Sequence, residues 1–437
     1  MSAAPAPVPG PLAPDGARRL FAAGNRADWS RHVARFGALD LAGIGPAWLT
    51  LLAESGLTGR GGAQFPLWRK VEAVRSAADS AGLTMSPVVV ANGVEGEPLS
   101  EKDRTLLTHA PHLVLDGLAV ASRLVGAKAS YLCLSTEIPE LSAAIAARPA
   151  GAQGTRKRPV LVQTEARFIA GEASAVVQAI ATGRSTPRTH VDRLSTRGLK
   201  GRPTLVNNVE TLAQLGLLAR FGAAWFRSVG TSTDPGTRLV TVHFGDGEPR
   251  VLEVPGGVGL AEVLGYCGIG VDRVEALLVG GYHGCWVPRD QIQRLTLGGP
   301  LGMAPGAGIL YALPRGQCGL RASSRIADYL ASQSTGQCGP CRFGLPSVAG
   351  LFRDLVHGDS GFQGQSGAEL ARLNHLVGLL PGRGACHHPD GSARFIADAL
   401  TVFHEDLLAH AHGRCLAGSA RPQAHTQPLG ARRLEVG

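Results

Sequence analysis

Short apolar runs alternate with longer amphipathic stretches between about residue 67 and residue 225. The runs are rich in β-branched residues, which is typical of buried parallel strands, and the stretches have helical spacing. The pattern predicts strands over 87–91, 129–134 and 159–163, and helices over 111–125, 138–147 and 171–182. This alternation favours a doubly wound, Rossmann-like α/β domain, which we place at residues 17–225.

The pattern changes twice after that region. A small α+β module is expected at 238–314, with strands over 239–244, 250–254 and 276–280 around a short helix at 259–266. A helical bundle is expected at 318–413, with helices over 320–332, 345–356, 366–379 and 391–411. The Ala/Pro-rich residues 1–16 and the tail 414–437 are expected to be disordered.

The composition is that of a globular protein, with 44% hydrophobic and 18% charged residues among 437. The formal charge of +9 comes from dispersed arginines rather than a basic run. This argues against nucleic-acid binding and suits anionic ligands or an acidic partner. No apolar segment of about 18 residues and no signal peptide is present. We therefore expect a cytoplasmic protein without membrane insertion, which reaches the inner face of a membrane only through a partner.

Three of the eight cysteines form a candidate metal site. Cys338 and Cys341 make a C-x2-C pair, and Cys386 follows just before a predicted helix. Thiolates are preferred iron–sulfur ligands, usually spaced C-x2-C-x2-C with a distant fourth cysteine. That spacing puts the first ligand at Thr335. The residues alone leave open an iron–sulfur cluster, a redox disulfide, or a zinc site completed by His387 or His388.

Three polar loops add candidate ligand-binding residues. The glycine-rich loop contains Gly59, Arg60, Gly61 and Gly62, then Phe65-Pro66 and Lys70. Closely spaced glycines let backbone N–H groups approach a phosphate, which Arg60 or Lys70 can neutralise.

The other two loops are polar as well. One carries Asn92, Glu95 and Glu97 at the end of a predicted strand, where ligands bind in open α/β sheets. The other carries Asn207 and Asn208, where asparagine is also a good helix cap.

Together these segments resemble the NADH-binding flavoprotein subunit of respiratory complex I and its relatives in NAD-reducing hydrogenases and formate dehydrogenases. The similar motifs are Gly-Arg-Gly-Gly-Ala-x-Phe-Pro at 59–66, the acidic loop at 92–104, Pro-Thr-x-Val-Asn-Asn-Val-Glu-Thr at 203–211, and Gln-Cys-Gly-Pro-Cys-Arg at 337–342. The resemblance covers nearly the whole chain.

The resemblance implies FMN, an iron–sulfur cluster and NADH as electron donor, with a β-grasp, soluble-ligand-binding fold at 238–314. It also implies a ferredoxin-like or other electron-transfer subunit as partner, and a membrane-associated acceptor beyond it. Phe65, Glu97 and Glu172 would line the nicotinamide side. The implied cofactor-binding residues are Gly59, Arg60, Gly61, Gly62, Phe65, Lys70, Asn92, Glu95, Glu97, Gly171, Glu172, Asn207 and Asn208, and the implied cluster ligands are Cys338, Cys341 and Cys386.

The chain departs from the family pattern at several of these positions. Gln64 replaces a glycine, Val94 and Ala173 replace acidic residues, and Thr189-His190-Val191-Asp192-Arg193 replaces a Lys-Pro-Pro-Phe segment. Thr335 stands where the family has the first cluster cysteine, and Cys318 cannot replace it because helix 320–332 would hold it about 20 Å away.

These departures leave alternatives open. The cluster could be 4Fe-4S with a non-thiolate fourth ligand, 3Fe-4S, or lost. The leading hypothesis is an NADH dehydrogenase-type flavoprotein. The alternatives are an FMN/iron–sulfur relay that no longer binds NADH, and a non-redox scaffold with empty sites.

Overall fold

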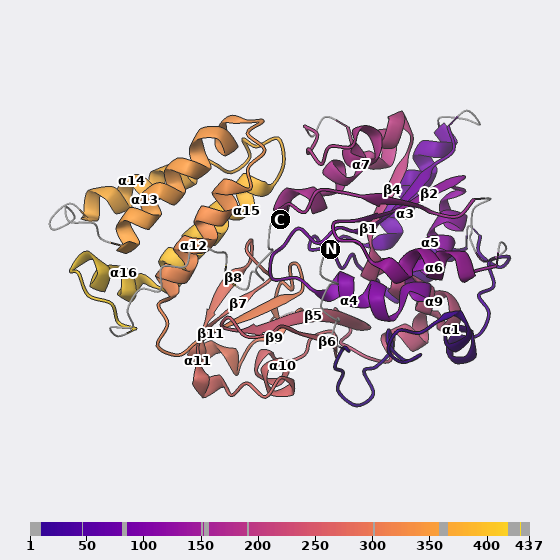
Figure 1. Cartoon of the computed structure of the whole chain (residues 1–437), viewed down its shortest axis with the longest axis horizontal. Helices are drawn as coiled ribbons and strands as arrows, with labels where there is room; N and C mark the ends of the chain where they lie inside the picture. The colour runs from indigo at the N-terminus through magenta and orange to yellow at the C-terminus, as the bar shows by residue number, and fades with distance from the viewer. Residues whose placement is uncertain are drawn as a thin grey trace, which may run out of the picture.

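The computed structural model describes residues 10–45, 47–80, 85–149, 152, 157–189, 192–299, 302–357, 366–417 and 429. Figure 1 shows three regions: a parallel sheet wrapped by helices on the right, a second sheet in the lower centre, and a group of helices at the upper left. The predicted combination of an α/β region with a parallel sheet and a helical C-terminal region is confirmed.

The first sheet has four parallel strands in the order β3-β2-β1-β4. The three predicted strands are present, and the fourth was not foreseen as a strand. Their bounds are β1 Val88–Gly93, β2 Ala129–Leu134, β3 Val160–Gln163 and β4 Thr204–Asn208.

Both faces of β1 are buried because its apolar residues alternate between two cores. Val89 and Ala91 belong to the larger core, which includes residues of α3, α5 and α9. Val88 and Val90 belong to a smaller core on the opposite face, which includes residues of α7. A strand covered on both faces reads as a continuous apolar run, which is why the sequence pattern found it.

The helices of this region are α1 Trp29–Phe36, α2 Trp48–Ser55, α3 Leu67–Ser80, α4 Lys102–His109, α5 Pro111–Val125, α6 Pro139–Ala147, α7 Ala173–Thr182, α8 Leu194–Arg197 and α9 Val209–Arg227. The helix expected at 171–182 begins two residues later, because Glu172 is its N-cap and Phe168–Gly171 form a separate 3₁₀ turn.

The second sheet has five strands in the order β6-β5-β11-β7-β8. Its central strands β5 and β11 are parallel, whereas the other neighbours are antiparallel. The strands are β5 Thr237–Phe244, β6 Arg250–Pro255, β7 Val274–Val279, β8 Cys285–Pro288 and β11 Ile309–Pro314. The same segment holds α10 Leu260–Tyr266, α11 Arg289–Ile292, and the short strands β9 Thr296–Leu297 and β10 Gly302–Met303.

The C-terminal helices are α12 Gly319–Ser332, α13 Leu345–His357, α14 Ser366–Gly378, α15 His388–Val402 and α16 His404–Ala411. The prediction of one helix over 391–411 is wrong. Phe403 breaks it, with φ −105° and ψ 33°. Its ring packs edge-on against Trp286 at 5.3 Å between ring centroids, so burial of this side chain turns the backbone out of the helix.

The two segments expected to be disordered are described in part. Within residues 1–16, Leu12 bonds to the edge strand β6: its N–H donates to Val251 O at 2.9 Å, and its carbonyl accepts from Glu253 N at 2.9 Å. Within 414–437, residues 414–417 and Leu429 are described, and Leu429 is buried. Among the described helices, none is both long and apolar enough to cross a bilayer.

Candidate functional site

The predicted polar loops meet at the carboxyl ends of β1 and β4. These strands are hydrogen-bonded neighbours, and their register sets Asn92 opposite Asn208. The glycine-rich loop lies against the same point, since a Cβ added to Gly61 would lie 3.1 Å from Asn208 Cβ. Three segments that are far apart in the sequence are therefore brought together at one sheet edge, where α/β folds bind ligands.

The two adjacent asparagines have different environments. Asn208 caps α9, because its Oδ1 accepts from Glu210 N at 2.9 Å, while its Nδ2 donates to Asp103 Oδ2 at 2.6 Å. Asn207 is buried, and its Nδ2 has no hydrogen-bond partner among the described residues. A buried amide without a partner costs free energy, so Asn207 is the stronger candidate for a ligand contact.

A buried ionic network supports this edge. Lys102 Nζ donates to Asp103 Oδ1 at 2.7 Å and to Glu210 Oε2 at 2.9 Å. Burial opposes the charge on Lys102, but its carboxylate neighbours prevail and raise its pKa. Burial raises the pKa of Asp103 to about 7, against the lowering effect of Lys102. The network continues to the second sheet, because Leu239 N donates to Glu210 Oε1 at 2.8 Å.

The glycine-rich loop is closed by its own backbone, with Gly59 N donating to Phe65 O at 2.9 Å. Arg60 was predicted to neutralise a phosphate, but its guanidinium is buried in the scaffold, 3.3 Å from Asp234 Oδ1 and 3.1 Å from Pro235 O. Gln64 has φ 48°, so it keeps the left-handed backbone that favours the glycine it replaces.

The acidic loop contains one structural carboxylate and one that is incompletely bonded. Glu95 covers the start of α4, accepting from Asp103 N at 2.8 Å and Arg104 N at 2.9 Å. Glu97 Oε2 accepts from Tyr282 N at 3.1 Å, whereas its Oε1 is buried without a partner among the described residues. Burial raises the pKa of Glu97 to about 8.

The segment around residue 171 closes the opposite side of the acidic loop. Asn92 Nδ2 donates to Gly171 O at 2.9 Å. Glu172 caps α7 by accepting from Ala175 N at 3.0 Å, and it also bonds Ser174. Asn92 and Glu172 thus hold backbone in place at the site edge.

A cavity of about 880 Å³ opens beside these loops. Phe65, Lys70 and Glu172 line it, and Phe65 is 44% exposed. Burial lowers the pKa of Lys70, whose ammonium donates to Val206 O at 3.3 Å. The volume lies within the range typical of cofactor and substrate pockets.

The cysteine loop, residues 334–341, runs into a π-helical turn, Pro340–Gly344, so Cys338 lies before this turn and Cys341 within it. The loop is folded over Cys341, because Ser334 Oγ donates to Cys341 O at 3.1 Å and accepts from Gly336 N at 3.0 Å. Burial, and then the neighbouring Cys338 thiol, raise the pKa of Cys341 to about 12. Thr335, which is half-buried, lies between Ser334 and Gly336 in the sequence.

Cys386 lies close to the same loop. Burial raises its pKa, and the charges of Glu172 and Cys338 add to that rise. In the described chain, the only group of three or more His, Cys, Asp or Glu residues with donor atoms within 4.8 Å of one another is Cys318, His410 and Cys415. Cys338, Cys341 and Cys386 do not form such a group in the described chain, although both Cys338 and Cys386 affect the pKa of Cys341.

The two histidines beside Cys386 have protein partners. His388 Nε2 lies 2.9 Å from Leu330 O, and His387 Nδ1 lies 3.1 Å from Asp390 Oδ2. Cys318 precedes α12, whereas the cysteine loop follows it. The 14 residues of α12 span about 20 Å, in agreement with the exclusion of Cys318 as the missing ligand.

One short segment contacts both the acidic loop and the cysteine loop. Arg167 Nη2 donates to Ser334 O at 3.3 Å, and Phe168 N donates to Gln333 Oε1 at 3.2 Å. The same segment approaches the acidic loop so closely that a Cβ on Gly96 would lie 2.4 Å from Arg167 O. The two halves of the candidate site are therefore in direct contact through residues 167–172.

Comparisons with known proteins agree with this arrangement. The profile of the Nuo51 FMN-binding domain matches residues 52–216, and that of the NADH-ubiquinone oxidoreductase-F iron-sulfur binding region matches residues 321–410. The second F-type subunit of the NADH-quinone oxidoreductase of Rhizobium meliloti (strain 1021) is 30% identical over 385 residues, which is 83% of this chain and 88% of the relative. The chain belongs to the family of F-type subunits of NADH-quinone oxidoreductase.

Other members and structures show the same relationship. The F-type NADH-quinone oxidoreductase subunit of Streptomyces coelicolor (strain ATCC BAA-471 / A3(2) / M145) is 29% identical, covering 84% of this chain and 83% of the relative. The crystal structure of an NAD⁺-reducing [NiFe]-hydrogenase in the H₂-reduced state superposes with a TM-score of 0.73 at 29% identity. The match covers 83% of this chain and 62% of the hydrogenase chain. The resemblance inferred from the loops is confirmed, together with its oxidoreductase class and its FMN and iron–sulfur regions.

Several departures from the family motifs gather along the cavity. Ala173, Thr189 and Arg193, all at such positions, line its wall. His190 and Val191, from the same altered segment, lie outside the described residues. Arg188 also lines the cavity, and its N–H donates to Ser174 Oγ at 2.9 Å. These departures therefore line the same cavity as residues 204–206 of β4.

Sequence reasoning missed the residues that act through tertiary contacts. Lys102 and Glu210 lie inside the matched motifs, so their position next to Asp103 and Asn208 was the available signal. Tyr282 lies between β7 and β8 and donates its N–H to Glu97, and no motif in the sequence pointed to it. The same holds for Phe168, whose ring centroid lies 4.9 Å from that of His283.

Proposed function

We propose that this chain is an NADH-oxidising flavoprotein subunit that passes electrons from NADH through FMN to an iron–sulfur cluster and on to a partner subunit. The observation that carries the proposal is the contact of residues 167–172 with both the acidic loop and the cysteine loop. Electron transfer between two cofactors requires them to be close, and this segment leaves little protein between the two loops.

The residues at the sheet edge fit a flavin. Asn207 offers a buried amide without a partner among the described residues, and Gly61 provides a close approach beside Asn208. We assign FMN to Gly59, Gly61, Gly62, Asn92 and Asn207, with Lys70 at the cavity as a cation for its phosphate. Arg60, Glu95 and Asn208 keep these loops in shape through the contacts described above. FMN, when bound, accepts two electrons as a hydride and releases them singly, while the protein supplies position and electrostatics.

The cavity fits the nicotinamide nucleotide. Phe65 offers an exposed ring, and Arg188 and Arg193 provide positive charge for phosphates. Glu97 is not among the residues that line the cavity, but its buried Oε1 has no partner in the described chain. Glu97 is largely protonated below pH 8, so its carboxyl can donate a hydrogen bond rather than repel the nucleotide. Glu72, Glu172 and Asp192 are the acidic residues among those that line the cavity, and Ala173 stands where the family has a second glutamate.

The cysteines fit a cluster with three thiolate ligands, namely Cys338, Cys341 and Cys386. We propose a 4Fe-4S cluster whose fourth iron is bound by Thr335 or water, or else a 3Fe-4S cluster that lacks this iron. One thiolate fewer makes the site less negative, which favours the reduced form and raises the reduction potential relative to a four-cysteine site.

The three regions of the chain also correspond to three proposed functional domains. We propose an FMN and NADH domain at 17–225, a β-grasp, soluble-ligand-binding module at 238–314 and a cluster-bearing bundle at 318–413. The order β6-β5-β11-β7-β8, with parallel central strands and α10 crossing between β6 and β7, supports the β-grasp assignment. An electron-transfer subunit is the proposed partner, because Phe343 beside the cysteine loop is 66% exposed and offers an apolar contact there.

Anaerobic reduction tests the function. Protein purified without oxygen should contain FMN, iron and sulfide, and NADH should bleach the flavin absorbance within the mixing time of a stopped-flow instrument. Flavin that stays oxidised with NADH but bleaches with dithionite would contradict NADH oxidation. That result would favour an FMN/iron–sulfur relay, the second candidate, which the altered cavity wall at Ala173, Thr189 and Arg193 supports. Colourless protein without iron would exclude both.

A further inference from the structure

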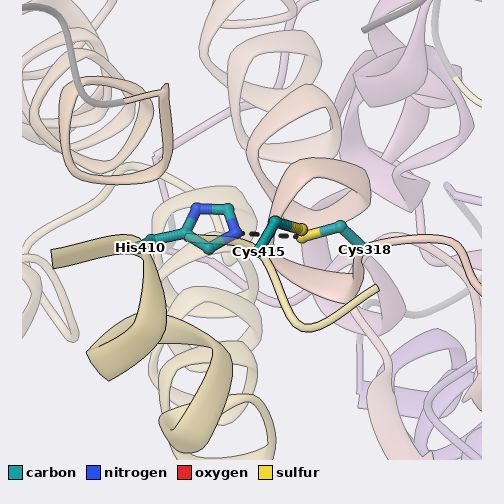
Figure 2. A group of neighbouring side chains, drawn as sticks. All are labelled: Cys318, His410 and Cys415. Atoms are coloured by element: carbon teal, nitrogen blue, oxygen red, sulfur yellow. Dashed lines mark hydrogen bonds between the residues drawn. The ribbon is translucent and has the colours of Figure 1, made fainter. Parts of the chain in front are cut away.

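A second group of metal-binding residues lies at the other end of α12 from the cysteine loop. Cys318 is the residue before α12, His410 is in the last turn of α16, and Cys415 follows that helix. Figure 2 shows the three side chains pointing toward one another. One donor atom from each lies within 4.8 Å of the others.

The spacing of these atoms matches a tetrahedral zinc site. Cys318 Sγ lies 3.5 Å from His410 Nε2. Zinc binds sulfur at about 2.3 Å and nitrogen at about 2.05 Å, so a tetrahedral angle puts the two donors about 3.6 Å apart. The pair could therefore accept the ion without moving apart.

The histidine is oriented by a second contact. Its Nδ1 lies 2.7 Å from Val356 O, and a carbonyl oxygen can only accept, so Nδ1 carries the proton. The lone pair is then on Nε2, the atom that faces Cys318. A ring nitrogen bonded to a backbone carbonyl while the other faces a ligand is the arrangement found in most metal-binding histidines.

Asp406 lies near this group, although its carboxylate is not among the donor atoms that all lie within 4.8 Å of one another. Asp406 lies one helical turn before His410 on α16, and positions four apart share a helix face. Its carboxylate accepts a hydrogen bond from the backbone N–H of Leu416, next to Cys415. Its negative charge also helps to raise the pKa of Cys318. Its buried Oδ1 has no partner among the described residues.

We propose that Cys318, His410 and Cys415 bind a zinc ion, with the fourth position filled by a water. Two sulfurs and one imidazole suit zinc better than magnesium or calcium, which prefer oxygen ligands. The ion would join the start of α12 to the loop after α16. This site is separate from the proposed redox function and does not depend on it.

Metal analysis of the full-length chain, purified under reducing conditions, tests the site. We expect about one zinc per chain in addition to iron. The double variant Cys318→Ser/Cys415→Ser should lose the zinc and keep its iron and flavin. Cys267→Ser is the matched control, because Cys267 is a buried free cysteine at the end of α10 and should retain both metals. Cys338→Ser should lose iron and keep zinc.

A second measurement guards against a folding defect in the double variant. Replacement of zinc by Co²⁺ should give sulfur-to-cobalt charge-transfer bands, and His410→Cys should keep the metal while shifting these bands. Wild-type protein without zinc would overturn the proposal, as would zinc that survives the double variant or leaves with Cys338→Ser. A Cys318–Cys415 disulfide found by mass spectrometry in the reduced preparation would also overturn it, because the sulfurs would then not be free to bind metal.

Discussion

The flavin side and the cluster side of the site use their motif residues differently. At the sheet edge, three motif side chains form hydrogen bonds within the protein. Arg60 bonds Asp234, Glu95 bonds the start of α4, and Asn208 bonds the start of α9. In the cysteine loop, burial and then the neighbouring Cys338 thiol raise the pKa of Cys341. A motif can therefore mark a scaffold in one region and a set of ligands in another, and substitutions can separate the two roles.

The largest effect is expected on the cluster side. Cys341→Ser should abolish iron binding, because two thiolates remain, yet leave folding nearly unchanged since serine fills almost the same space. Iron analysis and circular dichroism measure both effects. Thr335→Cys is the opposite change and should increase retained iron and lower the reduction potential by restoring a thiolate. Full iron content in Cys341→Ser would show that this thiol is part of the scaffold.

The next largest effect is expected in the scaffold of the flavin side. Lys102→Ala should reduce the free energy of unfolding by about 3–5 kcal/mol, because it leaves the carboxylates of Asp103 and Glu210 buried without their cation. Urea denaturation of the two proteins gives the difference. Lys128→Ala, a change at an exposed lysine, is the control and should alter stability by less than about 0.5 kcal/mol. A similarly small loss of stability in Lys102→Ala would contradict the prediction, because it would mean that water reaches and solvates the carboxylates of Asp103 and Glu210.

The neighbouring asparagines offer a matched pair on one strand end. Asn208→Ala should cost about 1–2 kcal/mol of stability, because the cap of α9 and the bond to Asp103 are lost. Asn207→Ala should cost less than about 1 kcal/mol of stability, because its Nδ2 has no partner to lose among the described residues. It should weaken FMN binding about tenfold, because the proposed contact of this amide with the flavin is lost. Equilibrium dialysis of FMN and thermal melting distinguish the two. Equal effects of both substitutions on stability would remove the contrast.

The last comparison concerns Glu97, which accepts a hydrogen bond from Tyr282 N between β7 and β8. Its pKa rises from 4.5 to about 8 on folding, so the folded protein holds a proton there that the unfolded chain has released. Stability should therefore fall as the pH rises from 4.5 to 8 and level off above 8. Glu97→Gln should flatten this part of the profile. Urea titrations at several pH values test this, and an unchanged slope in the variant would assign it to Glu253 and Asp103, whose pKa values burial raises to about 7.

The elements and the loops differ in how far the sequence could predict them. Val88 to Ala91 form an unbroken apolar run because both faces of the strand are covered, so periodicity was sufficient there. Periodicity did not reveal the break at Phe403, which depends on its contact with Trp286, a residue from the second sheet. Motif spacing predicted which loops meet, but not that Arg60 turns to Asp234, because that choice depends on a loop from another region. The group at Cys318 was hidden for the same reason: its members are brought together only by the fold.

The hydrogen bond from Leu239 to Glu210 limits how this protein could have been assembled from parts. Glu210 takes one bond from the flavin region, through Lys102, and one from the second sheet. A gene fragment ending before residue 237 would leave a buried carboxylate half satisfied, so the two regions could not readily be inherited or exchanged as separate units. The bundle begins after both partners of Glu210, so recombination could add or replace it without disturbing this bond.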